Sequence, residues 1–359
     1  MFDRPRPALM AVLALALPAC GDAKPVPVSR LTGPTDSLVA FFGEISEAAW
    51  LGRNRWGILA PNDEAVAIVD LALHQVRRLG GEGHEEIRNP STLFRLGDTL
   101  AVGDWGLRRT TLWTLEGRAA GAIPAPGGAL RGVLPRAVDG AGHFYYELAP
   151  QPGPDGLGNR DSAAVVRAAP GDGKDDTLAR LTPADIAEVE GDAGRRFEQR
   201  VFSGSDRWGV LPDGSLWVAR VYENRVAWRE AGGGWRKGEP LPDRVLEVTR
   251  YDRELFLRKF PPELRNMAEQ LPFAAIKPPF EAGLTAAGGD VWLEKSRAPA
   301  DSVRMYQVVD REGRLRREIH LPGRGRVVAV GDSEVLVVEP GRDGAHLLGF
   351  TIPVETATP

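Results

Sequence analysis

Short apolar runs separated by tight turns recur along most of this chain, and the pattern is clearest over residues 206–242. Three apolar runs follow one another there, at 208–211, 216–219 and 226–228, and a run of three glycines then leads into Trp235. Asp213-Gly214 separates the first two runs, and Asp-Gly between apolar runs is the strongest short-range signal of a β-hairpin. The pattern therefore predicts four consecutive antiparallel strands.

The same unit recurs along the chain, in forms that differ in regularity. The turn before one short apolar strand marks each unit, and these turns lie at 62–64, 97–98, 139–140, 213–214, 288–289 and 331–332. About 35 to 43 residues separate the first three turns and the last two, whereas the gaps on either side of the fourth are about twice as long. A unit of about 37 residues with four strands has the size of a β-propeller blade. We count six blades and assign insertions to the two long gaps.

The two long gaps show patterns of their own. Thr182 followed by Pro183 is typical of a helix start, and we expect no hairpin in 182–202. In the second gap the pattern predicts a long strand near 245–256, a short helix near 263–270 and a proline-rich loop over 271–280. The predicted fold is all-β: a six-bladed propeller of four-stranded antiparallel blades, with short helices in two insertions.

The last unit shows only three strands, at 327–330, 335–338 and 346–352. A propeller closes its ring so that no long strand edge stays open. The strand-like segment at 26–31 belongs to no unit, so we predict that it supplies the fourth strand of the last blade. The propeller then spans residues 26–353, and residues 354–359 form a C-terminal tail.

Residues 1–19 have the three parts of an export signal. Arg4 and Arg6 form the positive end, an apolar run covers 7–17, and Pro18-Ala19 leads to the cleavage point. That run is too short to span a hydrocarbon core of about 30 Å as a helix. The pattern predicts a signal peptide and an exported protein.

Cys20 is the only cysteine of the chain, so it can form no internal disulfide. Residues 17–20 resemble a bacterial lipobox, whose cysteine becomes the lipidated first residue. We expect lipidation of Cys20, a lipidated tether over 20–25, and a place in the bacterial cell envelope on the periplasmic or surface side. The alternative is an ordinary secreted protein that is cleaved nearby.

Charge and composition narrow the classes of partner. The formal net charge is −4, and no basic stripe runs along the chain. We therefore do not expect a nucleic-acid partner. The 42 glycines and 29 prolines are scattered, which suits many short strands joined by turns.

Charged residues follow the second strand of five units, at positions that we expect on one rim of the central channel. They are Asp104, Glu147, Arg220, Glu294 and Glu339. Converging carboxylates are how a protein holds a hard cation such as Ca²⁺. The alternative is that strand ends carry charges because they meet water. Trp105 and Asn224 are further candidates for ligand contact at this rim.

No catalytic residue is predicted. The five histidines show no metal-binding spacing, and no Gly-x-Ser-x-Gly elbow is present. Four of the nine tryptophans, at 208, 217, 228 and 292, fall inside apolar strands, so we expect them to be mostly core between blades.

A turn is followed by a Leu/Val-Trp-Val/Leu run and a charged residue, and then by a strand such as 225–228 or 305–313. In this pattern the chain resembles six-bladed propellers of the NHL and TolB-like kind. The resemblance covers roughly residues 26–353. Residues 223–226, Glu-Asn-Arg-Val, are the nearest approach to the usual Gly-Asn-x-Arg-Ile element of NHL repeats. The family binds proteins, sugars or nucleic acids and includes some enzymes, so membership fixes no activity.

We expect an envelope-anchored, non-catalytic module that binds a protein or glycan partner through its rim, without a cofactor. The alternative is a Ca²⁺-dependent lactonase or hydrolase that resembles gluconolactonase-type propellers. Its metal ligands would be Glu147, Asn224, Glu294 and Glu339. The sequence does not indicate an oligomeric state.

Overall fold

The structure, a computed structural model, describes residues 26–81, 86–169, 175–191 and 194–353. The predicted signal peptide, Cys20 and the C-terminal tail lie outside these residues, so their assignments stay predictions. Among the described residues, no helix has both the length and the apolar character needed to cross a membrane.

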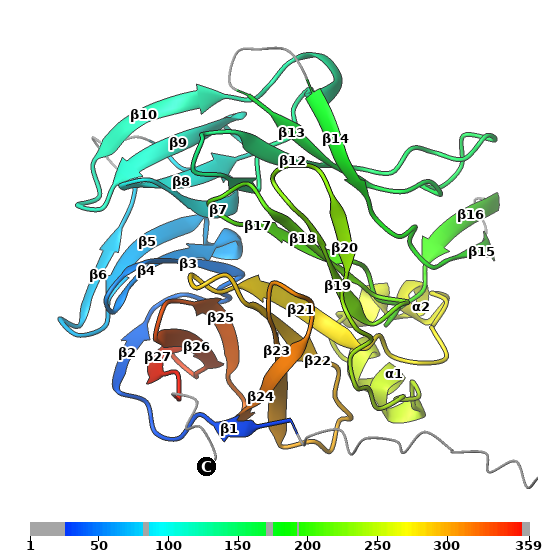
Figure 1. The fold of residues 1–359 in the computed structure, drawn as a ribbon. Coiled ribbons are helices and arrows are strands. Elements are labelled where there is room, and N and C mark those ends of the chain that lie inside the picture. The colour runs from blue at the N-terminus through cyan, green and yellow to red at the C-terminus, as the bar shows by residue number, and fades with distance from the viewer. Residues whose placement is uncertain (1–25, 82–85, 170–174, 192–193, 354–359) are drawn as a thin grey trace, which may run out of the picture.

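Six four-stranded antiparallel sheets surround a common axis, which confirms the predicted fold class (Figure 1). From the inner to the outer strand they are β3 (Glu47–Gly52), β4 (Arg55–Ala60), β5 (Ala65–Asp70) and β6 (Gln75–Arg78); β7 (Pro90–Leu96), β8 (Thr99–Asp104), β9 (Arg109–Thr114) and β10 (Ala119–Pro124); β11 (Ala137–Val138), β12 (Phe144–Leu148), β13 (Ala164–Ala168) and β14 (Asp175–Arg180); β17 (Arg207–Val210), β18 (Leu216–Arg220), β19 (Arg225–Arg229) and β20 (Trp235–Lys237); β21 (Phe280–Thr285), β22 (Val291–Lys295), β23 (Val303–Val309) and β24 (Leu315–Pro322); and β25 (Arg326–Val330), β26 (Glu334–Pro340), β27 (Ala345–Thr351) and β2 (Asp36–Ala40). We number these sheets as blades 1 to 6.

Five of the six marker turns precede the second strand of their blade, as expected. The turn at 62–64 is different: it contains the short 3-10 helix η1 (Pro61–Asp63) and precedes β5, the third strand of blade 1. The second strand is β4, which follows Asn54, a residue with φ of 53°. The count of six blades is unaffected.

The ring closes through an N-terminal strand, but through a different segment from the one predicted. The closing strand is β2, which pairs with β27 from Asp36↔Gly349 to Ala40↔Ala345. The segment near 26–31 contains β1 (Val28–Arg30), which pairs in parallel with β24 as a fifth strand of blade 5. The prediction was wrong because residues 26–31 have the pattern of a strand. Leu31 is buried, but at the seam between blades 5 and 6.

The apolar core lies between the blades. Six clusters of buried residues fill the six seams between neighbouring blades. Trp217, Trp228 and Trp292 are 1–2% exposed within these seams, which confirms their prediction as inter-blade core, whereas Trp208 is half-buried. Neighbouring inner strands contact one another around the complete ring, so the blades surround a central channel.

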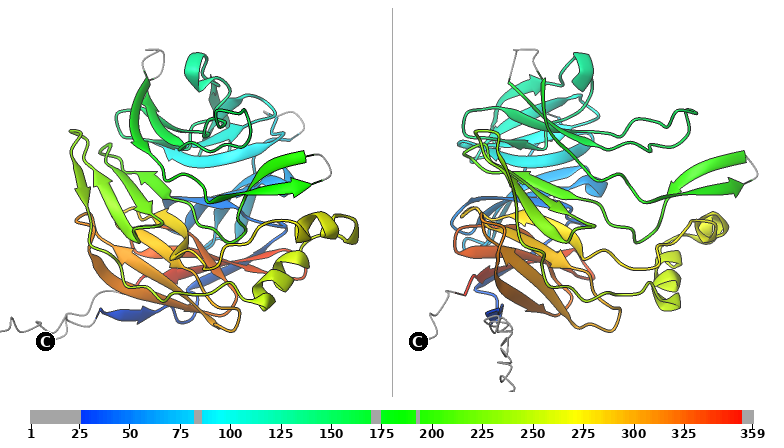
Figure 2. Two further views of the ribbon diagram at one scale, coloured as in Figure 1. Left: turned by 90° about the vertical axis from the view of Figure 1, so that its right-hand side faces the viewer. Right: turned by 45° about the vertical axis from the view of Figure 1, so that its right-hand side comes forward.

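The disc has two different faces. Loops between second and third strands, and the connections from one blade to the next, lie on the face that we call the insertion face; the remaining turns lie on the opposite face. Three long segments project from the insertion face on the side of blades 3 to 5 (Figure 2). They are the loop at 149–163, the hairpin of β15 (Ile186–Gly191) with β16 (Gly194–Gln199), and the pair of helices α1 (Arg250–Leu257) and α2 (Pro262–Glu269).

The first insertion is a hairpin rather than the predicted helix. β15 and β16 pair in continuous register from Ile186↔Gln199 to Gly191↔Gly194. Thr182 caps no helix, because its backbone N–H and its hydroxyl both donate to the buried Asp206 carboxylate, at 2.8 and 2.9 Å. A tertiary contact therefore overrides the local capping signal.

The second insertion confirms one helix and replaces a predicted strand by another. The predicted helix near 263–270 is α2, whereas the predicted strand near 245–256 contains α1. Thr249 and Asp252 form a reciprocal capping box that begins α1, and the sequence analysis missed this pair. Asp252 is buried and also accepts a hydrogen bond from Lys277 Nζ at 2.6 Å.

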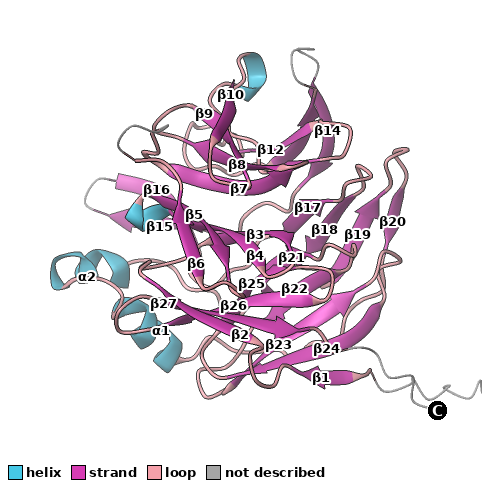
Figure 3. Cartoon of the chain, turned by 90° about the vertical axis from the view of Figure 1, so that its left-hand side faces the viewer, coloured by secondary structure: helices cyan, strands magenta, loops and turns pink. Residues whose placement is uncertain are grey.

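A small aromatic cluster ties both insertions together. Phe256 of α1 packs against Phe202, Phe260 and Phe273, with ring centroids 5.1 to 6.0 Å apart. In Figure 3 the helices and the hairpin lie on the same side of the strands. The insertions thus pack together along one part of the insertion face. We call the loop at 149–163, the hairpin of β15 and β16, and the helices α1 and α2 the wall.

Candidate functional site at the channel mouth

Charged residues stand at the beginning of most inner strands. The chain enters each blade from the insertion face, so the first residues of an inner strand lie at this mouth of the channel. Glu47 begins β3, Arg207 begins β17 and Arg326 begins β25. Arg136 directly precedes β11, and Glu281 is the second residue of β21. We call Glu47, Arg136, Glu147, Arg207, Trp208 and Glu281 the channel-mouth cluster. Arg326 instead donates to the Ile45 carbonyl.

The cluster is connected across blades. Arg136 contacts Glu147 at 3.1 Å and Glu47 at 4.0 Å, which joins blade 3 to blade 1. Trp208 of blade 4 donates from Nε1 to Glu147 Oε2 at 2.6 Å. Arg207 donates to the backbone carbonyl of Glu281 at 2.7 Å, which joins blade 4 to blade 5. These contacts therefore link blades 1, 3, 4 and 5 at the mouth.

Burial shifts the pKa of three members of the cluster, Glu47, Glu281 and Arg207. Burial raises the pKa of Glu47, although the positive charge of Arg136 and a hydrogen bond from the Leu93 backbone N–H oppose the shift. Burial also raises the pKa of Glu281, and the charge of Glu294 adds to the effect. Perturbed pKa values that gather in one region of a structure mark a candidate functional site.

Arg207 shows how the mouth is built. Burial lowers its pKa, and the nearby positive charge of Arg136 lowers it further. Arg207 and Glu281 are nevertheless exposed to solvent. Both observations hold together if water reaches the side chains while the protein surrounds them on most sides, as in a channel. Two guanidinium groups near each other are suited to bidentate contact with a carboxylate or phosphate.

Two of the predicted rim residues lie at or near this cluster. Glu147 is a member, at the hydrogen-bond distances given above. Glu294 is buried, contacts Arg304, and acts electrostatically on Glu281. The structure therefore brings Glu147 and Glu294 to the same mouth, each with an arginine partner.

Asp104 and Arg220 hold backbone and core groups instead. Asp104 is 1% exposed and accepts hydrogen bonds from the backbone N–H groups of Arg88, Asn89 and Leu107, at 2.8 to 3.2 Å. Arg220 donates to Asp206, whose side chain is fully buried, at 2.8 Å. Both side chains fasten neighbouring loops. The buried Asp104 does not fit the alternative that strand ends carry charges because they meet water.

The remaining predicted residues lie apart from one another. Asn224 adopts a φ of 45° and donates from Nδ2 to the Leu241 carbonyl at 2.7 Å. Glu339 is half-buried beside the blade 5–6 connection. Trp105 follows the end of β8 and is 46% exposed.

Among the described residues, no group of three or more His, Cys, Asp or Glu side chains is arranged to hold a metal ion. Two of the four ligands of the alternative hypothesis have arginine partners: Glu147 contacts Arg136, and Glu294 contacts Arg304. Asn224 donates from Nδ2 to a backbone carbonyl, and its Oδ1 is buried without a hydrogen-bond partner in the described part of the chain. The geometry of these residues does not favour a Ca²⁺ site.

The sequence analysis missed Glu47, Arg136, Arg207 and Glu281. It considered only the ends of second strands, whereas the first residues of inner strands reach the same rim closer to the axis. A signal was present, because charged residues begin five of the six blades at equivalent positions. Pairing of Arg136 with Glu47 could not be predicted, since the two residues meet only when the ring is closed.

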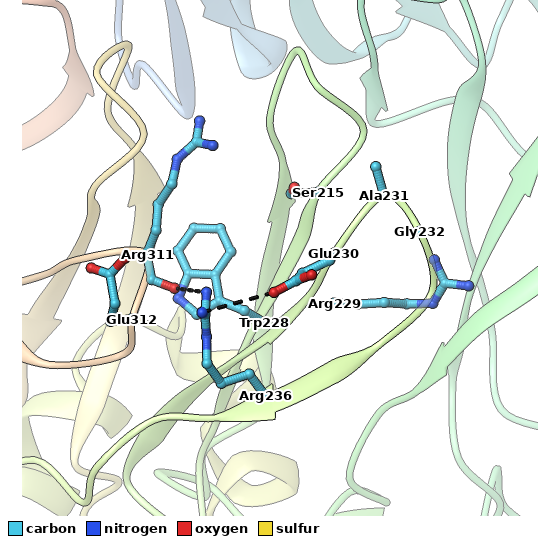
Figure 4. A pocket seen from close by; sticks show the side chains of 9 residues that line it. All are labelled: Ser215, Trp228, Arg229, Glu230, Ala231, Gly232, Arg236, Arg311 and Glu312. Atoms are coloured by element: carbon cyan, nitrogen blue, oxygen red, sulfur yellow. Dashed lines mark hydrogen bonds and ion pairs between the residues drawn. The ribbon is translucent and has the colours of Figure 1, made fainter.

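The opposite face carries a shallow cavity of about 400 Å³ between blades 4 and 5 (Figure 4). Two of its three arginines are already held: Arg236 donates to the Arg311 carbonyl at 2.6 Å and lies 3.8 Å from Glu230, while Arg311 contacts Asp213 at 2.7 Å. Figure 4 shows Arg229 pointing away from this group. These contacts fasten neighbouring turns, so we place the candidate site at the channel mouth.

Comparison with known proteins supports the fold. No protein-family model and no curated protein matches the chain. A solved structure of a DUF4221 family member from Bacteroides vulgatus matches with 10% identity over 90% of this chain and 98% of that chain, at a TM-score of 0.52. A gluconolactonase from Xanthomonas campestris matches with 13% identity, 87% and 88% coverage and a TM-score of 0.46.

A third solved structure, the calcium-binding protein regucalcin from Agrobacterium tumefaciens, matches with 11% identity, 92% and 98% coverage and a TM-score of 0.44. Likeness at such identities shows the fold and no activity. With its six blades, its closing strand β2 and its likeness to the DUF4221 structure, the chain is a six-bladed β-propeller.

Proposed function

We propose that this protein is a non-catalytic binding module of the cell envelope, which takes up a protein or glycan partner on its insertion face. The main observation in support is the channel-mouth cluster, in which arginines and glutamates from four blades meet. The wall lies beside this cluster (Figure 2). Function in propellers concentrates where loops and channel residues of several blades converge, because a rigid scaffold there positions many side chains at once.

The chemistry of the cluster suits recognition. Its members are arginines, glutamates and one tryptophan, whose contacts are ion pairs and hydrogen bonds. None is a hydroxyl or thiol nucleophile beside a base, which covalent catalysis by such groups requires. Arg136 and Arg207 favour a partner that presents a carboxylate, such as an acidic side chain or an acidic sugar.

The presence of the wall beside the mouth favours a large partner over a small ion. The 149–163 loop and the hairpin contact each other, since Arg195 lies 3.1 Å from Asp155 and Arg160 stacks 4.4 Å over the Phe197 ring. The wall borders the mouth on the side of blades 3 to 5 and leaves the side of blades 6, 1 and 2 lower (Figure 2). A partner can thus rest on the low side and against the wall.

Cross-linked capture from the native envelope tests this proposal. The tagged full-length protein is compared with Arg136→Gln/Arg207→Gln at the mouth and with Arg236→Gln/Arg311→Gln on the opposite face. Both double variants remove two arginines, so they change the net charge equally. We expect captured partners to be lost with the mouth variant and kept with the opposite-face variant, at matched thermal stability. Equal loss, or loss only with the opposite-face variant, contradicts the proposal.

We further propose that Cys20 carries the lipid that anchors the protein. The supporting observation is a single cysteine at the end of a signal-like segment. Metabolic labelling with a fatty acid, followed by membrane fractionation, tests the anchor in the wild type and in Cys20→Ser. We expect label and membrane association in the wild type alone, and label in the variant contradicts the assignment.

A further inference from the structure

A cavity of about 550 Å³ lies at the outer part of the seam between blades 4 and 5. Residues 242–244, which lead into the helical insertion, form one wall. The end of β22, the 296–302 loop and the outer strands β23 and β24 form the rest. Small-molecule sites have volumes in the range of roughly 300 to 1,000 Å³, so this cavity has sufficient size. It is distinct from the channel mouth, because third and fourth strands line it.

Three hydrogen-bond acceptors stand side by side on this wall. Gln307 of β23 and Glu318 of β24 are direct partners across the antiparallel pair, and His320 lies two positions further along β24 on the same face. All three residues line the cavity. Their placement follows from strand register, which gives the side chains of one face a fixed spacing.

The three acceptors lack good protein partners. Gln307 is 1% exposed, and its Oε1 is buried without a hydrogen-bond partner. His320 Nε2 is also buried without a hydrogen-bond partner. The Glu318 carboxylate has only long contacts, at 3.5 Å to Gln307 Nε2 and 3.6 Å to His320 Nε2. A buried acceptor without a donor is costly and calls for an explanation, such as a ligand that supplies one.

Two of the three cationic side chains that line the cavity are engaged in ion pairs, and the third, Arg297, acts electrostatically on Asp301. Lys295 is 8% exposed, lies 2.9 Å from Asp243, and also donates to the Pro242 carbonyl at 3.3 Å. Arg244 contacts Asp301 at the edge of the cavity. The charge of Glu318 also acts on Lys295, yet within the described part of the chain no donor lies closer than 3.5 Å to the Glu318 carboxylate, and Gln307 Oε1 and His320 Nε2 have no hydrogen-bond partner. The unsatisfied groups of this wall are therefore acceptors, which a hydrogen-bond donor would satisfy.

We propose that this cavity binds a small primary amine. An ammonium group carries three N–H donors and no acceptor, which matches the Gln307 Oε1, Glu318 carboxylate and His320 Nε2 acceptors. The imidazole accepts when its proton is on Nδ1. The Val303 and Met305 side chains line the same cavity and provide an apolar surface for an alkyl chain. The positive charge of the ligand is balanced by Glu318.

Titration calorimetry with n-hexylamine tests the proposal on the full-length protein. 1-Hexanol is the matched probe, because it has the same alkyl length without the charge. We expect saturable binding of hexylamine and at least about tenfold weaker binding of hexanol, which corresponds to about 1.4 kcal/mol. Absence of saturable binding at millimolar concentration, or equal binding of both probes, overturns the proposal.

A pair of variants locates the binding. Glu318→Gln keeps the size of the side chain and removes its charge, and we expect it to weaken hexylamine binding about tenfold or more. Glu230→Gln makes the same change at an exposed position of the opposite face and should leave binding unchanged. Equal affinities in the two variants overturn the site, provided that both unfold at the wild-type temperature. The channel-mouth variants keep hexylamine binding, so this result is separate from the partner capture described above.

Discussion

At the scale of single residues, polar atoms in the seams link one blade to the next. Trp50 Nε1 of blade 1 donates to Glu334 of blade 6 at 2.7 Å, and Trp217 Nε1 of blade 4 donates to Thr285 of blade 5 at 2.9 Å. Each indole fills an apolar seam and also makes a directional bond, so it fixes how neighbouring blades are oriented. The buried Asp206 acts similarly, because it joins Thr182, Val221 and Arg220.

Arg220→Met is expected to lower the free energy of unfolding by roughly 3 kcal/mol, because it leaves the buried Asp206 carboxylate without its cation. Urea denaturation measures this loss. Arg167→Met is the matched control, since Arg167 pairs with the exposed Asp176 and such a pair contributes about 1 kcal/mol or less. Similar losses in both variants would show that Asp206 does not depend on Arg220.

Glu47→Gln is expected to stabilise the protein at neutral pH. Burial raises the pKa of Glu47, so the folded state favours the protonated form. The stability that Glu47 contributes is thus complete below the pKa of the unfolded chain and is lost as the pH rises through the raised folded value. Glutamine imitates the protonated form and can still accept from Leu93 N–H. Thermal melts should show a higher melting temperature for the variant at pH 8 and equal temperatures near pH 4; a lower temperature at pH 8 refutes the prediction.

At the scale of elements, two N-terminal strands have different tasks. β2 completes blade 6 and contributes Ala40 to the core between blades 1 and 6. β1 extends blade 5 by three residue pairs and places Leu31 in the neighbouring seam. Loss of β2 opens the ring, whereas loss of β1 exposes one outer strand edge.

Two truncations separate these tasks. Deletion of residues 26–33 removes β1, and deletion of residues 26–41 removes β1 and β2. We expect the shorter deletion to keep a cooperative unfolding transition at a reduced melting temperature, and the longer one to abolish that transition. Circular dichroism during heating measures both. Equal effects of the two deletions would mean that ring closure does not depend on β2.

The hairpin of β15 and β16 projects from the disc and contributes little to the seams. Replacement of residues 186–199 by a short Gly-Ser linker is expected to change the free energy of unfolding by on the order of 1 kcal/mol or less. The same variant should lose partner capture, because it removes part of the wall. Retained capture at wild-type stability would exclude the hairpin from the binding surface.

At the scale of the whole molecule, the ring turns six similar units into two unlike faces. The opposite face consists of short turns, while the insertion face combines the channel mouth with the wall (Figure 2). Arginines from blades 3 and 4 occupy the mouth among the glutamates, and this arrangement separates it from a site built on carboxylates alone.

Calcium is therefore expected to leave the melting temperature of the folded protein unchanged. Saturation at 100 times the dissociation constant adds about 2.7 kcal/mol to stability, which a thermal shift assay detects easily. The assay is run with Ca²⁺, Mg²⁺, Mn²⁺ and Zn²⁺ after treatment with a chelator. A clear upward shift with any of these ions would revive the metal-dependent hydrolase hypothesis.

The sequence by itself determined the repeat. Alternating apolar runs and Gly- or Asp-containing turns encode hairpins locally, so the six blades, the inter-blade tryptophans and the helix α2 could be predicted from neighbouring residues. The positions of Glu147 and Glu294 near the ends of second strands could be predicted for the same reason, because they are a property of the repeat.

Features that depend on contacts between distant residues were decided only by the tertiary structure. The local pattern favoured the segment at 26–31 as the closing strand, whereas pairing with β27 selects β2. Thr182 carries a helix-capping signal, yet Asp206 binds it and a hairpin follows. The channel-mouth cluster joins residues of blades 1, 3, 4 and 5 that are distant in sequence, and electrostatic contacts of this kind exist only after the ring closes.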